Sequence, residues 1–204
     1  MTHRIRNANP GDIDEIMRIE NASFAEGIRE NRETFLDRIE VCRGCVTVLE
    51  DEREDGCAPS TPQHSDKKPG RLIGYLSAEI WDRVPEPTAE AYRLGHPAKE
   101  RHFATGCVLY VSSFAVAPLA RGGTGRAFFR GSIERIAKAT PSIERIVFIV
   151  HEHWLAARHI YETEGFDYTG TIAGFFRRDA MHDSLLPNAR GSVGADALIM
   201  ERRL

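Results

Sequence analysis

Apolar residues recur along the chain with two spacings, and these spacings divide it into short helices and strands. Side chains three or four positions apart share one face of a helix, whereas β-rich runs of four to ten residues indicate strands. The helical spacing predicts helices beginning at Asp12, over about 30–40, over 126–139 and over 155–163. The β-rich runs predict strands at 4–6, 45–50, 72–81, 107–116, 143–150, 166–172 and 197–204.

The helix boundaries have recognisable end signals. Asp12 with Glu15 three residues later has the spacing of a capping box, and Gly165 stands where a left-handed residue closes the helix over 155–163. The order of elements interleaves helices with strands, which is typical of an α/β or α+β layered domain. We therefore expect one domain over 1–204, in which helices interrupt a mixed sheet.

Two long connections interrupt this pattern. Residues 51–70 are rich in Pro, Ser, Asp and Lys and predict an exposed, flexible loop. Residues 82–106 form a long insertion in which 88–94 could make one or two helical turns. A connection of this length commonly forms a lid or binding loop, although a surface insertion without a role is the alternative.

Composition excludes several classes of protein. The 204 residues are 42% hydrophobic and 28% charged, as in ordinary globular domains. A net charge of -3 gives no global field for nucleic acid or an anionic membrane, and no apolar stretch approaches the length of a spanning helix. We expect a cytoplasmic protein without nucleic-acid or membrane partners. Its four cysteines are expected as reduced thiols, without a zinc site or other metal.

The most informative segment is 113–127, where a strand runs through a glycine-rich turn into a helix. Glycines allow backbone N–H groups to approach an anion, and a helix N-terminus favours negative charge, so this segment predicts a phosphate-binding turn. The GGTGR sequence lacks the Lys-Ser/Thr pair of a Walker loop, and the dinucleotide spacing fails at Phe128. A turn that merely requires small residues is the alternative.

Taken with residues 150–166 (VHEHWLAARHIYETEGF), this segment resembles the GNAT superfamily of acetyl-CoA-dependent N-acetyltransferases. The family has a V-x-P strand end, an R-x-x-G-x-G/A turn and a later segment ending in Y-x-x-x-G-F. Here Arg121 stands two residues before Gly123, and Trp154 replaces the usual Asn. The resemblance covers 107–168 by motif and implies a GNAT-like mixed, splayed central sheet with helices on both faces.

The resemblance also implies coenzyme-binding residues. The strand end that faces pantetheine and the diphosphate turn comprise Phe114, Ala115, Val116, Arg121, Gly122, Gly123, Thr124, Gly125 and Arg126. The later segment contributes Trp154, Ala157 and Tyr161. Acetyl-CoA is the implied cosubstrate, and the implied reaction is direct transfer of its acetyl group to a primary amine in a ternary complex.

Two proton transfers accompany such a reaction. Tyr161 is expected to protonate the departing thiolate as general acid, with a packed core tyrosine as the alternative. Strand alternation places Tyr110, Ser112, Phe114 and Val116 on one face, with the hydroxyls turned toward the acyl group. The amine's proton then has several candidate acceptors, namely Glu79, Tyr110, Ser112, His151 and Glu152.

The acceptor itself is a small-molecule or peptide amine that the sequence does not identify. Loops 82–106 and 173–195 are expected to present it. A non-catalytic acyl-CoA-binding sensor or scaffold is the alternative function, and a homodimer is left open.

Overall fold

The computed structural model describes residues 3–51, 71–117, 120, 123–177 and 194–204. Its strands are β1 (His3–Asn7), β2 (Val46–Asp51), β3 (Arg71–Trp81), β4 (Val108–Val116), β5 (Arg145–His151), β6 (Asp167–Arg177) and β7 (Gly194–Arg203). Its α-helices are α1 (Ile13–Ser23), α2 (Arg32–Val41), α3 (Ala98–Arg101), α4 (Thr124–Ala139) and α5 (Leu155–Thr163), with short 3-10 turns at Pro10–Asp12 and Glu26–Ile28.

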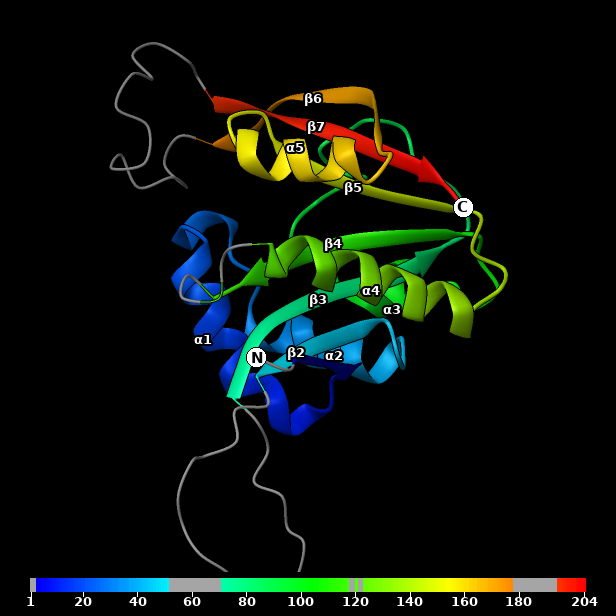
Figure 1. The fold of residues 1–204 in the computed structure, drawn as a ribbon. Helices are drawn as coiled ribbons and strands as arrows, with labels where there is room; N and C mark the ends of the chain where they lie inside the picture. Colours follow the sequence, from blue (N-terminus) through cyan, green and yellow to red (C-terminus); the bar gives the residue numbers. More distant parts are fainter. Residues whose placement is uncertain (1–2, 52–70, 118–119, 121–122, 178–193) are drawn as a thin grey trace, which may run out of the picture.

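All seven strands form one sheet in the order β1-β2-β3-β4-β5-β7-β6. Every neighbouring pair is antiparallel except β4 and β5, which run parallel. The β4–β5 pairing covers only three residue pairs and ends at Tyr110 and Val147. Beyond that point the two strands diverge, so the sheet is splayed at its centre (Figure 1). The predicted mixed, splayed sheet is confirmed.

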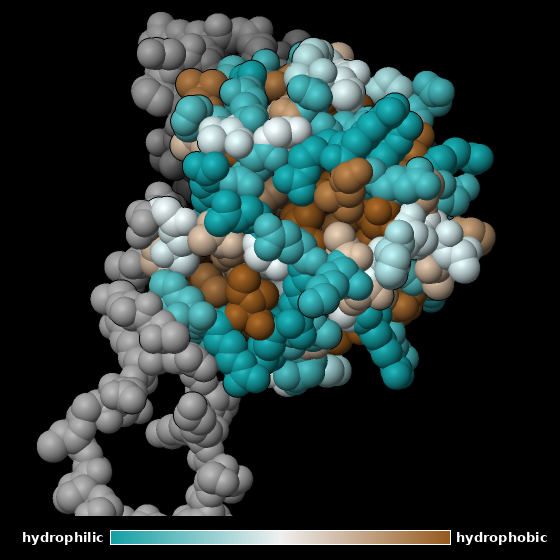
Figure 2. Space-filling model, turned by 45° about the vertical axis from the view of Figure 1, so that its right-hand side comes forward, coloured by the Kyte–Doolittle hydropathy of each residue, from teal (hydrophilic) through white to brown (hydrophobic). Residues whose placement is uncertain are grey.

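Helices cover both faces of this sheet. Helices α4 and α5 lie on the face toward the viewer in Figure 1, and α1 and α2 lie behind it. Phe129 and Ile133 of α4 pack with Leu109 and Phe148 in one buried cluster. On the opposite face, apolar residues of helices α1 and α2 pack against the strands in a second buried cluster, which includes Tyr75. On the face shown in Figure 2, hydrophobic side chains gather in a recess with hydrophilic ones around it.

The start of α1 differs from the predicted capping box. Asn9, rather than Asp12, is the capping residue: its side chain accepts a hydrogen bond from the Gly11 N–H, and Asp12 accepts one from the Asn9 N–H at 2.8 Å. A 3-10 turn over Pro10–Asp12 therefore precedes the α-helix. Asp12 also binds Arg6 through both carboxylate oxygens, so its side chain is not free to cap α1.

The 82–106 insertion folds back on the sheet. The predicted helical turns at 88–94 are present as one turn, in which the Tyr92 N–H donates to the Thr88 carbonyl at 3.2 Å, and the short helix α3 comes later, over Ala98–Arg101. Phe103 N–H donates to the carbonyl of Ile80 at 2.7 Å, which ties the end of the insertion to β3. Two of the insertion's own side chains, Tyr92 and His96, are buried. The insertion therefore has a fixed position against the core.

Some connections differ from the expectation. Cys42 and Cys45 form a disulfide in the turn between α2 and β2, so the expectation of reduced thiols is wrong for this pair. The tight turn places their Cα atoms 5.5 Å apart, a distance that suits a disulfide.

The expected 173–195 loop is shorter, because β6 continues to Arg177 and β7 begins at Gly194. Residues 52–70, the bulk of the expected flexible loop, lie outside the described part of the chain.

No helix among the described residues is long and apolar enough to cross a membrane. In the same residues, no group of three or more His, Cys, Asp or Glu side chains is placed to hold a metal ion. The cytoplasmic location remains a prediction.

Candidate functional site

A cleft lies where β4 and β5 diverge. It encloses about 630 Å³, counting space that is open to solvent. The strands contribute Val111, Ser112, Ser113, Phe114, Phe148, Ile149, Val150 and Phe176, the α-helices Phe129 and Tyr161, and the remaining segments Phe24, Ile28, Glu30, Leu94 and Trp154. The lining is therefore mostly apolar, with a few polar groups, as in many small-molecule sites.

The N-terminus of α4 lies beside the end of β4. Gly123 precedes the helix with a φ of +92°, a left-handed conformation that favours glycine. No described side chain caps α4, so its first backbone N–H groups are available to an anion. A Cβ at Gly125 would lie 3.7 Å from Val116 Cγ2, which shows how closely the turn approaches β4. Arg121 and Gly122 lie outside the described residues.

Two other residues of the predicted phosphate-binding turn, Arg126 and Thr124, lie in the first turn of α4. Arg126 forms an ion pair with Glu164, whose carboxylate is nearly buried at the end of α5. This pair links the first turn of α4 to α5, while almost half of the Arg126 side chain remains exposed. Thr124 is half-buried as the first residue of α4. The guanidinium therefore lies near the helix N-terminus, although its Nε is directed at Glu164.

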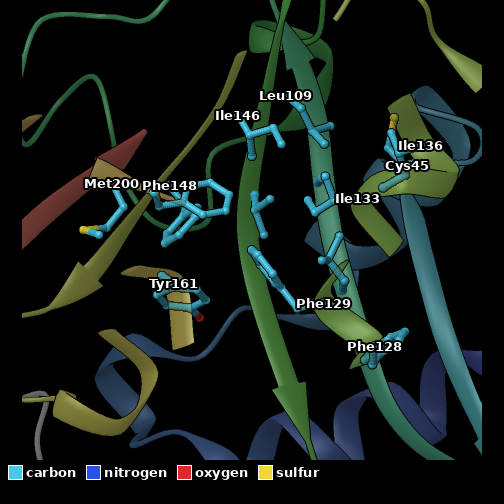
Figure 3. Close-up of a cluster of buried hydrophobic side chains, with 14 of the residues drawn as sticks. Cys45, Leu109, Phe128, Phe129, Ile133, Ile136, Ile146, Phe148, Tyr161 and Met200 are labelled. Carbon is cyan, nitrogen blue, oxygen red and sulfur yellow. The ribbon is translucent and has the colours of Figure 1, made fainter. Parts of the chain in front are cut away.

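Tyr161 occupies the wall of the cleft that α5 provides. Its ring packs against Phe148 and Phe129, with centroids 4.5 Å and 5.1 Å away. No hydrogen bond to a described residue engages its hydroxyl, and Figure 3 shows the oxygen turned toward the side on which Phe129 and β4 lie. Burial raises the pKa of the Tyr161 phenol above its ordinary value, so the hydroxyl keeps its proton.

Trp154 immediately precedes the first residue of α5 and packs among aromatic rings. It lies near Phe24 and Phe176, at 5.6 Å and 6.2 Å between centroids, and stacks on His151. Phe24 comes from the end of α1, so Trp154 connects the two halves of the splayed sheet across the cleft. Ala157, one turn further along α5, packs against the same core as Tyr161.

Strand β4 does not alternate as the sequence predicted. A β-bulge at Ser112 shifts its register against β3: Ser113 pairs with Ser77, while Val111 pairs with Ala78. Because a bulge adds one residue, the side chains before and after it exchange faces. Tyr110 therefore packs with Trp81 on one face, and Phe114 and Val116 pack with α4 on the other. The expectation that Tyr110 shares a face with Phe114 is wrong.

The bulge leaves Ser112 on the cleft wall, where its Oγ donates to the Ser77 carbonyl at 3.0 Å. The neighbouring Ser113 also lines the cleft, and it is turned toward α1 and β3. Phe114 is the predicted coenzyme residue of β4 that reaches the cleft, whereas Ala115 packs against α1 and α2.

Glu79 and most other candidate proton acceptors lie away from the cleft. Glu79 is fully buried, bound to His96 Nε2 and 4.0 Å from Arg38 Nε. Tyr110 stacks on Trp81, with centroids 3.9 Å apart. Glu152 accepts the Asp196 N–H at 2.8 Å. His151 is fully buried, and burial lowers its pKa. Among the sequence candidates, only Ser112 lines the cleft.

Two acidic residues near the cleft were missed in the sequence. Glu30 lines the cleft and pairs with Arg38, at 3.1 Å from Oε1 to Nη1. Glu20 is 1% exposed and bound to Tyr75. The spacing of Ile13, Ile16 and Glu20 places all three on the buried face of α1, so helical periodicity could have identified Glu20 as a buried acid.

Comparisons with solved structures identify the fold. The sequence matches no protein-family model and no curated protein. The loading GNATL domain of CurA from Lyngbya majuscula superposes with a TM-score of 0.71 at 11% identity, covering 100% of this chain and 98% of that one. The GphF GNAT-like decarboxylase in complex with isobutyryl-CoA gives 0.66 at 18%, covering 98% of each. Arabidopsis thaliana NAA60 in complex with a bisubstrate analogue gives 0.64 at 18%, covering 99% and 98%.

At these identities the likeness establishes the fold: the chain has the GNAT fold along its whole length. The fold expected from the glycine turn and the Y-x-x-x-G-F segment is thereby confirmed.

Proposed function

We propose that this chain is an acyltransferase that moves an acetyl group from acetyl-CoA directly to a primary amine. The observation that carries the proposal is the cleft between β4 and β5, which has an uncapped helix N-terminus beside the end of β4 and the Tyr161 hydroxyl on its wall. Several structural neighbours are described with CoA, an acyl-CoA or a bisubstrate analogue, which supports a CoA thioester as donor.

The described residues fit such a donor. The free N–H groups at the start of α4 suit a diphosphate. Beyond Tyr110 the backbone of β4 is not paired with β5, which leaves polar groups for the amides of a pantetheine arm. Phe114, Phe129 and Phe148 supply apolar walls around the place where the arm would end.

The reaction requires positioning and two proton transfers. The amine nitrogen forms a bond to the thioester carbon, and the C–S bond breaks with its electron pair on sulfur. Tyr161 lies on the wall of the cleft and donates a proton or hydrogen bond to that sulfur. The ammonium nitrogen loses two protons. One is released, and the other replaces the proton that Tyr161 gives to the sulfur, so ammonium and thioester yield amide, free thiol and H⁺. The enclosed cleft contributes by holding both reactants together.

The acceptor side of the cleft is apolar with one acidic group. Phe24, Ile28 and Leu94 come from the α1–α2 connection and the 82–106 insertion, and Glu30 lies among them. We infer an acceptor that joins a primary amine to an apolar group, either a small molecule or a peptide N-terminus. Among the structural neighbours, the NatC complex is described as bound to Gag peptide and CoA, and NAA60 and Naa20 are described in complex with a bisubstrate analogue. These descriptions support an acceptor of this class.

The test combines binding and turnover. Calorimetry with CoA and acetyl-CoA should show saturable binding, and thiol release should follow on adding phenethylamine or a tetrapeptide with an N-terminal Met-Leu. Binding without thiol release from any amine would favour the acyl-CoA sensor. Because one neighbour is described as a decarboxylase, malonyl-CoA is assayed in parallel, and CO₂ release without an amine would replace acyl transfer by decarboxylation.

A further inference from the structure

A buried chain of hydrogen bonds leads from the cleft into the core. Ser113 lines the cleft, and its Oγ lies 2.8 Å from the hydroxyl of Tyr75 on β3. The Tyr75 hydroxyl in turn binds Oε2 of Glu20 on α1. Tyr75 is 0% exposed and Glu20 is 1% exposed. The cleft surface is thus connected to a buried carboxyl group through two hydroxyls.

The partners of Glu20 fix the direction of this chain. Oε1 of Glu20 accepts the backbone N–H of Glu30 at 2.7 Å. An ionised carboxylate can only accept hydrogen bonds, so Tyr75 donates to Oε2. The Tyr75 hydroxyl hydrogen is then used in this bond, so the Ser113 hydroxyl donates to the Tyr75 oxygen at 2.8 Å, with Oε2 of Glu20 as its more distant acceptor at 3.5 Å. The lone pairs of Ser113 remain available on the cleft side, and each hydrogen in the chain points toward Glu20.

We propose that Ser113 and Tyr75 pass the proton of the attacking amine to Glu20, so that Glu20 is the terminal proton acceptor of the transfer reaction. The inference rests on the proposed acyl transfer. In the step, the amine nitrogen gives its proton to Ser113 Oγ, Ser113 gives its own to Tyr75, and Tyr75 gives its own to Glu20 Oε2. The carboxylate becomes a carboxylic acid, and the second nitrogen proton, lost as the amide forms, restores the Tyr161 phenol. The relay path returns the first proton to water once the products leave.

The surroundings of Glu20 suit this role. The groups that face it are the Tyr75 hydroxyl from β3, the Ser113 hydroxyl from β4 and the acidic Glu30 from the segment before α2. Burial, with a smaller contribution from the charge of Glu30, raises the pKa of Glu20 to about 7. A base is most effective when its pKa lies near the working pH, whereas an ordinary carboxylate is too weakly basic.

The other polar groups of the cleft are engaged elsewhere. Glu30 is paired with the permanent cation of Arg38, and Ser112 donates to the Ser77 carbonyl. Tyr161 serves the leaving thiolate in the proposed reaction. Among the described cleft residues, Ser113 is the one that connects the cleft to a carboxylate in the core.

The test is the pH dependence of kcat/KM with acetyl-CoA and phenethylamine. For the wild type we expect a rise toward pH 7 and a plateau above it, where Glu20 is ionised. For Glu20→Gln, which keeps the shape and an acceptor oxygen, we expect about 100-fold lower kcat/KM at pH 7. Its rate should continue to rise up to the pKa of the amine itself, near 10. A purely structural role of Glu20 would lower the rate without removing the plateau.

Ser113→Ala and Tyr75→Phe break the chain at its other members and should also remove the plateau. They keep the test valid if Glu20→Gln does not fold. The matched control is Ser112→Ala, which removes the adjacent hydroxyl outside the chain and should retain the plateau. Thiol release by the wild type with a retained plateau in Ser113→Ala or Glu20→Gln overturns the relay alone. Absence of thiol release by the wild type overturns the proposed function, and the relay with it.

Discussion

The ring of Tyr161 packs against the ring of Phe148 with centroids 4.5 Å apart and planes inclined by 61°. Edge-on packing of this kind fixes the ring without using the hydroxyl. The contact joins α5 to β5 on one side of the splayed sheet, and it holds the phenol on the wall of the cleft. The hydroxyl position is therefore set by packing, and its chemistry can be removed without removing the contact.

Tyr161→Phe should bind acetyl-CoA as the wild type does and lose about 100-fold in kcat. The ring contacts remain, so the melting temperature should change little. Binding is measured by calorimetry and turnover by thiol release. A variant with normal binding and full turnover would remove Tyr161 from the reaction.

The two glycines at the start of α4 should respond differently to alanine. Gly123 has a φ of +92°, so Gly123→Ala should lower the free energy of unfolding by about 1–2 kcal/mol. Gly125 lies within the helix, where alanine stabilises by about 0.5–1 kcal/mol. A Cβ at Gly125 meets only Val116, at an ordinary contact distance of 3.7 Å.

Gly125→Ala should therefore raise stability and still weaken CoA binding by about 10-fold, or 1.4 kcal/mol, because the methyl group lies beside the N–H groups proposed to hold the diphosphate. Denaturant unfolding and calorimetry give the two quantities separately. Unchanged CoA affinity in Gly125→Ala would place the diphosphate elsewhere.

Glu20 should make stability depend on pH. Its pKa is about 7 in the folded protein, raised mainly by burial, and near 4.5 when unfolded. The folded state binds more protons between these values, so the free energy of unfolding should fall as pH rises from about 4.5 to 7. The shift corresponds to a loss on the order of 3 kcal/mol.

Glu20→Gln should remove most of this decline, so it should be more stable than the wild type at pH 8. Urea unfolding at pH 5 and pH 8 compares the two proteins. Equal slopes with pH in both would show that Glu20 ionises normally in the folded state.

The buried pair of Glu79 and His96 should be structural. Removing Glu79 leaves the buried Nε2 of His96 without its partner and takes away one of the two carboxylates beside Arg38, so Glu79→Ala should cost about 3–5 kcal/mol of stability. Glu79→Gln retains a hydrogen-bonding side chain and should lose less. Both variants should keep the plateau of the pH profile above pH 7. Loss of that plateau in Glu79→Gln would restore Glu79 as a proton acceptor.

The sequence by itself determined the elements that depend on neighbours along the chain. Helix α5 spans Leu155–Thr163 as its periodicity predicted, and Gly165 has the expected left-handed φ of +80°. The glycine turn before α4 and the sheet class follow from local signals as well. Backbone conformation and amphipathic spacing are properties of short segments, so they can be deduced from consecutive residues.

Only the tertiary structure decided which polar groups meet. The bulge at Ser112 exchanged the faces of β4, and no residue within that strand signals it. Glu20, Tyr75 and Ser113 come from α1, β3 and β4, separated by 55 and 38 positions in the sequence. Strand register and helix docking bring them together, and burial then changes the pKa of Glu20. Such contacts depend on the packing of the whole chain, which is why local patterns identified Tyr161 and missed Glu20, the acid buried behind Ser113 and Tyr75.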